Sequence, residues 1–283
     1  MERIRLGGTG LKVSPLAFGT MTLGDPVAED TSLELLDFVV DQGINFIDTA
    51  NGYNAGLSEE IIGRWMKARG NRERIVLATK VRYAVGGDPD TAGSTPKVIL
   101  REVENSLRRL NTDYIDIYYL HQPDDDTPIE TTWRALESLV SSGKVRYIGV
   151  SNFSAWQVVE AVNLARNRGW TPPTVTQALH NAISRAVETE LLPMPRSYDI
   201  GTCMYNPLAG GLLTGKYTAG KEAGSDTRFA ANEMYRKRYW NDPQRTAADR
   251  FSRIAAQRGR TSAELALRYM LDHPDVDGTL FGA

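Results

Sequence analysis

Cysteine, long apolar runs and an export signal are scarce or missing in this chain. Its 283 residues include a single cysteine, Cys203, so no disulfide can form within the chain, which is typical of a reducing compartment. No apolar run approaches the roughly 20 residues of a membrane-spanning helix, and the N-terminal MERIRLGGTG has no apolar signal-peptide core. These absences predict a cytoplasmic protein without a membrane partner.

An excess of either charge is also missing. The chain has 33 Lys and Arg against 35 Asp and Glu, for a formal net charge of −2, which disfavours nucleic acid as a partner. Its histidines, His121, His180 and His273, are scattered without metal-ligand spacing, so we expect no metal site. Cys203 lies in the apolar run IGTCMY and is interpreted as a buried strand thiol rather than a nucleophile.

What the chain does have is a regular alternation of strand-like apolar runs and helical patterns. The predicted strands cover 16–19, 44–48, 74–81, 114–121, 145–150, 174–177, 201–205 and 277–282. The predicted helices cover 30–42, 58–69, 95–110, 129–142, 154–168, 188–199 and 262–272. Eight strands in this order favour a closed (β/α)8 TIM barrel, in one domain spanning 1–283. No G-x-G-x-x-G motif follows the first strand, which disfavours an open dinucleotide-binding sheet.

Three segments depart from this alternation. The start, RIRLGGTGLKVS, reads as a β-hairpin that closes the bottom of the barrel. Residues 207–242 form one long connection after the seventh strand, and such excursions on the active face usually serve a ligand. The sequence stops at Gly282-Ala283, directly after the eighth strand, so the eighth helix of the barrel is expected to be missing.

Polar residues follow the second, third and fourth predicted strands. Asp48 directly follows the run INFI, Lys80 follows IVLAT and His121 follows IDIYYL. Tyr53 lies five residues after Asp48. Alone, each of them has an ordinary structural interpretation, such as a loop cap or a solvated lysine. Because the carboxyl ends of barrel strands form the active face, we expect the four side chains to meet there.

These four side chains suit the reduction of a carbonyl group, which needs a proton donor beside the oxygen. A free tyrosine has a pKa of about 10, and a neighbouring ammonium lowers it. We therefore predict Tyr53 as the acid, Lys80 as the group that adjusts its pKa and Asp48 as the partner of Lys80. His121 is predicted to orient the substrate oxygen.

The later strands end in amides, a hydroxyl and an aromatic ring. Ser151 and Asn152 end the fifth strand, Gln177 the sixth and Tyr205 the seventh. Amides and hydroxyls can hold a carboxamide through paired hydrogen bonds, and a tyrosine can stack on a flat heteroaromatic ring. A nicotinamide has both features, although these residues alone fit a sugar or phosphate site equally well.

Several motifs resemble those of the aldo-keto reductase superfamily over nearly the whole chain. They are F-I-D-T-A-N-G-Y (46–53), A-T-K (78–80), L-H-Q-P-D (120–124) and G-V-S-N-F (149–153), with Gln177 and Tyr205. The resemblance implies NADPH-dependent reduction of small-molecule aldehydes and ketones. In the superfamily, Ser151, Asn152 and Gln177 match the carboxamide-binding residues, and Tyr205 matches the residue that stacks on the nicotinamide.

A narrower branch is indicated by the long connection. Y-N-P-L-A-G-G-L-L-T-G-K-Y (205–217) and M-Y-R-K-R-Y-W (234–240) resemble the aflatoxin-aldehyde and succinic semialdehyde reductases, and this branch suggests a homodimer. The resemblance implies that Leu208, Gly210 and Lys216 lie along the cofactor pyrophosphate.

Two further points follow from the same resemblance. It makes Arg228 a phosphate or substrate-carboxylate ligand, although Lys216 and Arg228 are also interpretable as surface cations. The segment that selects NADPH over NADH follows the eighth strand in the superfamily and is not in this sequence, so NADH is not excluded.

Two other functions remain open at this stage. Some barrels of the superfamily are β-subunits of potassium channels, in which cofactor sensing matters more than turnover, and the four polar residues do not exclude such a role. A barrel isomerase or aldolase would use Lys80 as a Schiff base. Tyr53 and the Ser151-Asn152 pair argue against that chemistry.

Overall fold

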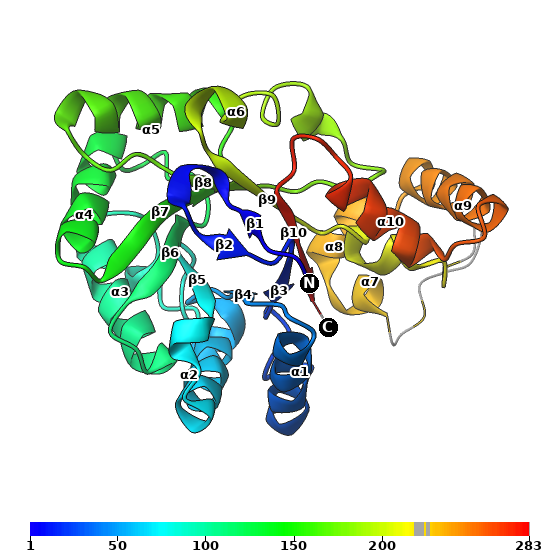
Figure 1. Cartoon of the computed structure of the whole chain (residues 1–283), viewed down its shortest axis with the longest axis horizontal. Helices are drawn as coiled ribbons and strands as arrows, with labels where there is room; N and C mark the ends of the chain where they lie inside the picture. The colour runs from blue at the N-terminus through cyan, green and yellow to red at the C-terminus, as the bar shows by residue number, and fades with distance from the viewer. Residues whose placement is uncertain (218–223, 225–226, 283) are drawn as a thin grey trace.

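Eight parallel strands close into a barrel at the centre of the molecule, as the computed structural model shows for residues 1–217, 224 and 227–282 (Figure 1). The barrel order is β10-β3-β4-β5-β6-β7-β8-β9. The strands are β3 (Leu16–Gly19), β4 (Phe46–Asp48), β5 (Val76–Val81), β6 (Ile115–Leu120), β7 (Val145–Ser151), β8 (Val175–Gln177), β9 (Gly201–Tyr205) and β10 (Gly278–Gly282). The predicted (β/α)8 barrel is confirmed.

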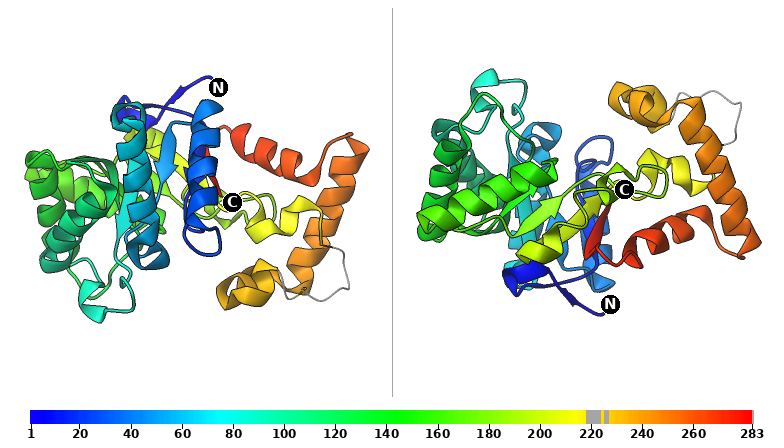
Figure 2. Two further views of the ribbon diagram at one scale, coloured as in Figure 1. Left: turned by 90° about the horizontal axis from the view of Figure 1, so that it is seen from below. Right: turned by 90° about the horizontal axis from the view of Figure 1, so that it is seen from above.

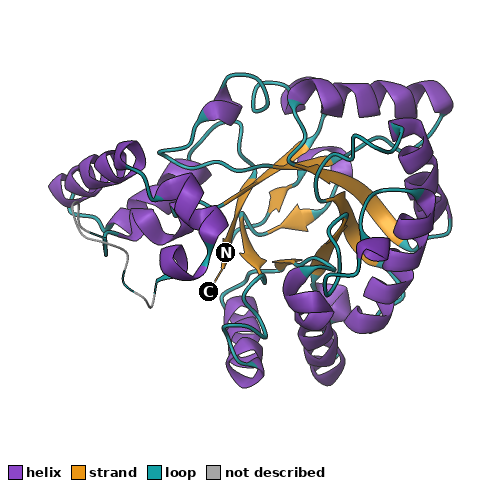
Figure 3. Cartoon of the chain, turned by 180° about the vertical axis from the view of Figure 1, so that it is seen from behind, coloured by secondary structure: helices purple, strands orange, loops and turns teal. Residues whose placement is uncertain are grey.

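The strands form where the sequence is mostly apolar. Every residue of β5 (VLATKV) and β6 (IDIYYL) is buried, because one face meets the barrel interior and the other meets the surrounding helices (Figure 3). The parallel register pairs Asp48 with Ala78 and Lys80 with Tyr119, so the carboxyl ends of β4, β5 and β6 lie at one rim.

Most predicted helices form, and the N-terminal signals that predicted them are used. Thr95 caps α3 by accepting a hydrogen bond from the backbone N–H of Val98, and Ser154 opens α5 in a capping box with Gln157. The helices are α1 (Glu29–Asp41), α2 (Leu57–Arg69), α3 (Pro96–Leu110), α4 (Ile129–Ser141), α5 (Ala155–Arg168) and α10 (Ser262–Leu271).

One helix prediction is wrong, and one helix was missed. The helix predicted over 188–199 is wrong, because this stretch forms only the end of a 3-10 turn η5 (Ala186–Glu188) and the short α6 (Pro195–Tyr198). Pro193 and Pro195 lack the N–H that a continuous helix needs. Conversely, α9 (Asp242–Gln257) was not predicted.

The long connection between β9 and β10 contains more helix than was predicted. It includes η6 (Ala209–Thr214), α7 (Arg228–Ala231) and α8 (Glu233–Tyr239) before α9 and α10. Residues 218–223 and 225–226 of the predicted connection lie outside the described residues. In Figure 2, α7 to α9 stand beside the barrel, and α10 runs from α9 back to it, where Met270 joins the main core. Leu212, Phe229 and Tyr239 form a separate buried cluster that packs η6 against α7 and α8.

The predicted N-terminal hairpin is present. Strand β1 (Ile4–Arg5) pairs antiparallel with β2 (Lys12–Val13), around the 3-10 turn η1 (Gly7–Thr9). The backbone N–H of Gly8 donates to the carbonyl of Asp199, just before β9, at 2.8 Å. Gly7 has φ +47°, and a Cβ there would lie 2.1 Å from the backbone nitrogen of Gly201, so this close approach requires glycine. The hairpin thus closes the end of the barrel opposite the rim that carries Asp48.

Among the described residues, no helix combines the length and apolar character needed to cross a bilayer.

Candidate active site

A cavity of about 770 Å³ opens at the carboxyl ends of the barrel strands. It is lined by all of the predicted site residues except Lys80, namely Asp48, Tyr53, His121, Ser151, Asn152, Gln177, Tyr205, Leu208, Gly210, Lys216 and Arg228. Lys80 is fully buried and contacts the cavity through Asp48 and Tyr53. The structure therefore brings together every residue that the sequence placed in the site.

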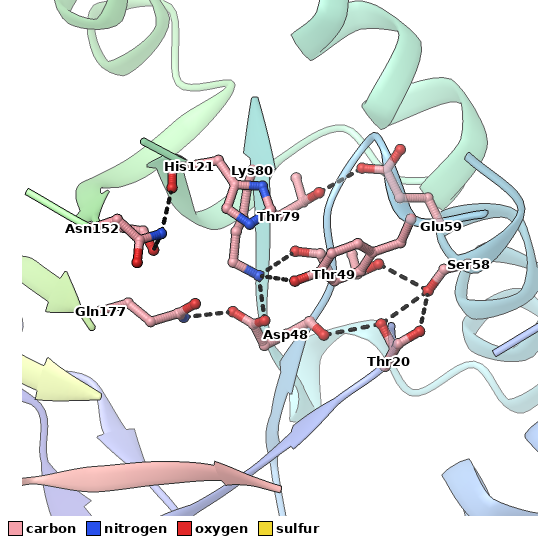
Figure 4. A network of polar contacts seen from close by, with 12 residues as sticks. Thr20, Asp48, Thr49, Ser58, Glu59, Thr79, Lys80, His121, Asn152 and Gln177 are labelled. Carbon is pink, nitrogen blue, oxygen red and sulfur yellow. Dashed lines mark hydrogen bonds and ion pairs between the residues drawn. The ribbon is translucent and has the colours of Figure 1, made fainter. Parts of the chain in front are cut away.

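Lys80 is held by three oxygen atoms on the wall of the barrel. Its Nζ forms an ion pair with Oδ1 of Asp48 and donates to the carbonyl of Thr49 at 2.8 Å (Figure 4). The hydroxyl of Tyr53 lies 3.3 Å from the same Nζ. A buried ammonium therefore sits within hydrogen-bond distance of the one phenol that the sequence predicted as an acid.

The charges of this pair are set by burial and by each other. Burial lowers the pKa of Lys80, but Asp48 and Tyr53 raise it by more, so the pKa is above its ordinary value. Burial raises the pKa of Asp48, opposed by Lys80 and by the amide of Gln177. Lys80 is therefore an ammonium at neutral pH.

Tyr53 keeps its proton at neutral pH. Burial raises the pKa of its phenol above 10.0, while the charge of Lys80 acts in the opposite direction. Lys80 thus lowers the phenol pKa as the sequence predicted, but desolvation outweighs it in this structure. The group is a protonated phenol with a cation ready to stabilise its conjugate base.

His121 is a neutral imidazole beside this phenol. Its ring meets that of Tyr53 edge-on, with centroids 5.8 Å apart, and that of Tyr83 at 4.8 Å. Burial, followed by the charge of Lys80, lowers the pKa of His121 well below 6.5. Its Nδ1 is buried and makes no hydrogen bond to any described residue.

A buried polar network supports the turn between β4 and α2 that carries Tyr53. The hydroxyls of Thr49 and Ser58 lie 3.0 Å apart, and Ser58 donates to the carbonyl of Thr20 at 2.8 Å (Figure 4). In the next residue, Glu59, the buried carboxylate accepts from Nε of Arg109 at 2.7 Å and from the hydroxyl of Thr79. These contacts join the first turn of α2 to the residue after β3, to β5 and to α3.

The amides predicted to hold a carboxamide already make hydrogen bonds within the protein. Asn152 donates from Nδ2 to the carbonyl of His121 at 2.9 Å and accepts from the hydroxyl of Tyr205 at 2.8 Å. Gln177 donates from Nε2 to Oδ2 of Asp48 at 2.9 Å, across the inside of the barrel (Figure 4). Asp48 thus pairs with Lys80 through Oδ1 and accepts a hydrogen bond from Gln177 through Oδ2.

At the other end, the cavity is walled by tight turns and cations. Gly210 and Gly211 in η6 have φ values of +66° and +102°, and the N–H of Gly210 donates to Oδ1 of Asn206 at 3.0 Å. A Cβ on Gly210 would lie 2.6 Å from the ring of Tyr235, so the turn is closely packed. Lys216 and Arg228 line the cavity beyond it.

Some lining residues were not predicted. After the first barrel strand, residues 19–22 line the cavity, whereas Leu23 is fully buried. Gln122, Met234 and Arg238 also line the cavity. The strand-end rule that found Asp48 would have found 19–22, because Gly19 ends β3 and 20–22 directly follow it.

Two aromatic residues of the connection pack it together. Tyr235 is buried and also lines the cavity. Trp240 packs against the rings of Tyr217 and Phe229, with centroid distances of 5.4 and 4.9 Å.

A comparison with known protein families agrees with this geometry. The model of the aldo/keto reductase family matches residues 15–283. The chain belongs to this family. Its membership makes the protein an oxidoreductase that uses a nicotinamide nucleotide.

Aldo-keto reductase relatives with different names cover almost the whole chain. An uncharacterised oxidoreductase, YrpG of Bacillus subtilis, is 38% identical over 291 residues, covering 100% of this chain and 87% of the relative. A probable voltage-gated potassium channel subunit beta of Arabidopsis thaliana is 37% identical over 293 residues, with the same coverage. Aflatoxin B1 aldehyde reductase member 2 of Rattus norvegicus is 36% identical over 271 residues, covering 92% of this chain and 72% of the relative.

Proposed function

We propose that this aldo-keto reductase reduces aldehydes and ketones to alcohols with NADPH, and that Tyr53 donates the proton. The observation that carries the proposal is the phenol of Tyr53, protonated and 3.3 Å from the buried ammonium of Lys80, at the floor of a large cavity. The aldehyde reductase name of the rat relative supports an aldehyde as one substrate.

The donor set of the cavity fits a nicotinamide nucleotide. Ser151, Asn152 and Gln177 supply hydroxyl and amide groups at the end beside Tyr53, and the ring of Tyr205 offers a stacking face. Lys216 and Arg228 supply positive charge at the other end, where phosphates would lie. The amide of Asn152 is already fixed by His121 and Tyr205, so it is oriented before any ligand arrives.

Side chains of the protein transfer the proton to the carbonyl oxygen. A bound nicotinamide nucleotide supplies the hydride. Tyr53 releases its proton to the carbonyl oxygen as negative charge develops there, and the ammonium of Lys80 stabilises the phenolate that remains. Asp48 keeps Lys80 charged and in place, and neutral His121 orients the carbonyl oxygen through a ring N–H.

The finer assignments belong to the same proposal. We assign NADPH rather than NADH from the family, and a cytoplasmic location from the single buried cysteine, Cys203. A homodimer is proposed from the resemblance to the aflatoxin-aldehyde reductases alone.

The test is a single substitution, Tyr53→Phe, with Tyr114→Phe as a matched control. Tyr114 precedes β6 and packs against Arg72 and Arg146, away from the cavity lining. With 4-nitrobenzaldehyde or succinic semialdehyde, Tyr53→Phe is expected to lower kcat by about 100-fold or more, while NADPH affinity stays within about threefold. Near-native turnover in Tyr53→Phe would refute Tyr53 as the acid.

A second candidate function is favoured by the plant relative named as a probable potassium channel subunit beta. In such a role the barrel would bind the cofactor and regulate a partner, with little turnover. Multiple turnovers of NADPH per protein chain support the reductase. Tight NADPH binding with a single turnover, and none afterwards, would favour the regulatory subunit.

A further inference from the structure

The turn that carries Tyr53 has an unusual backbone. Asn54, Ala55 and Gly56 follow one another with φ values of +48°, +56° and +96°, all in the left-handed region. Only Gly56 adopts this region without a steric penalty, and Asn tolerates it better than Ala. A conformation of this kind persists only where the surrounding contacts impose it.

Asn54 supplies those contacts through its side chain. Its Nδ2 donates to the carbonyl of Leu23 at 2.7 Å, to that of Asp25 at 3.0 Å and to that of Met21 at 3.3 Å. All three acceptors lie in the loop between β3 and α1. A single amide group therefore gathers several backbone carbonyls of one loop, and no described side chain of that loop is needed for the contact.

The loop held by Asn54 forms part of the cavity wall. Residues 19–22, which begin it, line the cavity next to Tyr53. Two backbone hydrogen bonds brace the loop internally: the N–H of Gly24 donates to the carbonyl of Val27 at 2.7 Å, and the N–H of Val27 donates to that of Thr22 at 3.1 Å. Asn54 directly follows the proposed proton donor, Tyr53. Its hydrogen bonds therefore connect the Tyr53 turn to a loop that forms part of the cavity wall.

We propose that Asn54 is a positioning residue that fixes the hydroxyl of Tyr53 against Lys80 by tying the Tyr53 turn to the loop between β3 and α1. The role in reduction rests on the function proposed above. The tie itself is a property of the fold and is tested separately. Without the hydrogen bonds of Asn54, the Tyr53 turn and the loop between β3 and α1 are no longer held together. The hydroxyl of Tyr53 then loses its fixed distance to Nζ of Lys80.

Two substitutions separate the side chain from the backbone. Asn54→Gly keeps the left-handed backbone without strain but removes the amide. Asn54→Asp keeps the size and tolerates the backbone, but sets carboxylate oxygens against three carbonyl oxygens. The matched control is Asn111→Gly, because Asn111 caps the end of α3 in the same left-handed conformation, at φ +53°, far from the cavity lining.

The first readout is steady-state kinetics with NADPH binding. Asn54→Gly and Asn54→Asp are expected to lower kcat by about 10- to 100-fold, as a misplacement of reacting groups does, while the NADPH dissociation constant changes less than about twofold. Asn111→Gly leaves kcat within about twofold. A folded Asn54→Asp variant with native kcat overturns the proposal.

The second readout is amide hydrogen exchange, which does not depend on turnover. Residues 20–28 and 53–58 are expected to exchange faster in Asn54→Asp than in the native chain, and at the native rate in Asn111→Gly. Unchanged exchange in both segments overturns the proposal. If the native chain shows no carbonyl reduction at all, the proposed function fails, and the exchange result alone decides whether Asn54 holds the turn.

Discussion

Asp48 and Lys80 form an ion pair from which water is excluded, with side chains 1% and 0% exposed. Two buried charges cost more in desolvation than their attraction returns unless further hydrogen bonds complete them. Here the amide of Gln177 donates a hydrogen bond to Asp48, and the carbonyl of Thr49 accepts one from Lys80. The remaining direction of the ammonium points to Tyr53, so the arrangement keeps a charge available for the phenol.

Removing one partner of this pair is expected to cost stability as well as activity. Lys80→Met leaves the carboxylate of Asp48 buried and unpaired, which we expect to lower the free energy of unfolding by about 3–5 kcal/mol. The double variant Lys80→Met with Asp48→Asn removes both charges and should regain part of that loss without regaining kcat. Urea unfolding and kcat measure the two effects. A Lys80→Met variant as stable as the native chain would contradict the buried-pair argument.

Acid is expected to destabilise the protein partly through His121. Its pKa in the folded chain is well below 6.5, so between these values the unfolded chain binds the proton and the folded chain does not. The free energy of unfolding therefore falls as the pH drops below about 6.5, by at most about 1.4 kcal/mol per pH unit from this residue.

The variant His121→Gln isolates this contribution. Urea unfolding at pH 7.0 and at pH 5.5 is expected to show a smaller difference in the variant than in the native chain. The remainder belongs to other groups, among them His180, whose pKa burial also lowers. An identical pH dependence in the two proteins would show that folding does not shift the pKa of His121.

The closely packed glycine turn predicts a selective loss of cofactor affinity. Gly210→Ala places a Cβ 2.6 Å from the ring of Tyr235, whereas Gly259→Ala, at a similar φ of +64°, meets nothing within 4 Å. Both changes carry the same backbone penalty of about 1 kcal/mol. Fluorescence titration should show about tenfold weaker NADPH binding in Gly210→Ala alone. Equal binding by the two variants would remove Gly210 from the cofactor site.

The cation at the far end of the cavity is expected to act on phosphate rather than on chemistry. Lys216→Met should weaken NADPH and NADH binding by a similar factor, roughly five- to tenfold, with kcat nearly unchanged, because charge-assisted contacts to phosphate contribute about 1–2 kcal/mol. Lys237→Met is the control, since Lys237 pairs with Glu233 on α8 and does not line the cavity. NADPH binding that is unchanged in Lys216→Met would show that Lys216 is only a surface cation.

The barrel and its polar rim could be predicted because both are encoded locally. A strand buried on two faces reads as a nearly continuous apolar run, and all eight predicted strands form with boundaries within two residues. Asp48, Lys80 and His121 follow directly from the ends of those runs.

Helix α9 was missed although local signals mark it, since Asn241 caps it and Pro243 stands in its first turn. Only the small Ala248 and Ala255 are buried on it, so the large core residues that marked the other helices are lacking. The other failures concern features that local pattern does not encode. The bond from Gln177 to Asp48 joins residues 129 positions apart and depends on closure of the barrel. Asn54 shows no periodic signal either, since its partners are backbone carbonyls.

The two ends of the cavity are formed by residues from separate stretches of the sequence. The proton-handling residues fall between Asp48 and His121, whereas the tight turn and the cations fall between Leu208 and Arg238, within the connection from β9 to β10. Exchange of that connection alone would therefore replace the residues at one end of the cavity and leave Asp48, Tyr53, Lys80 and His121 in place.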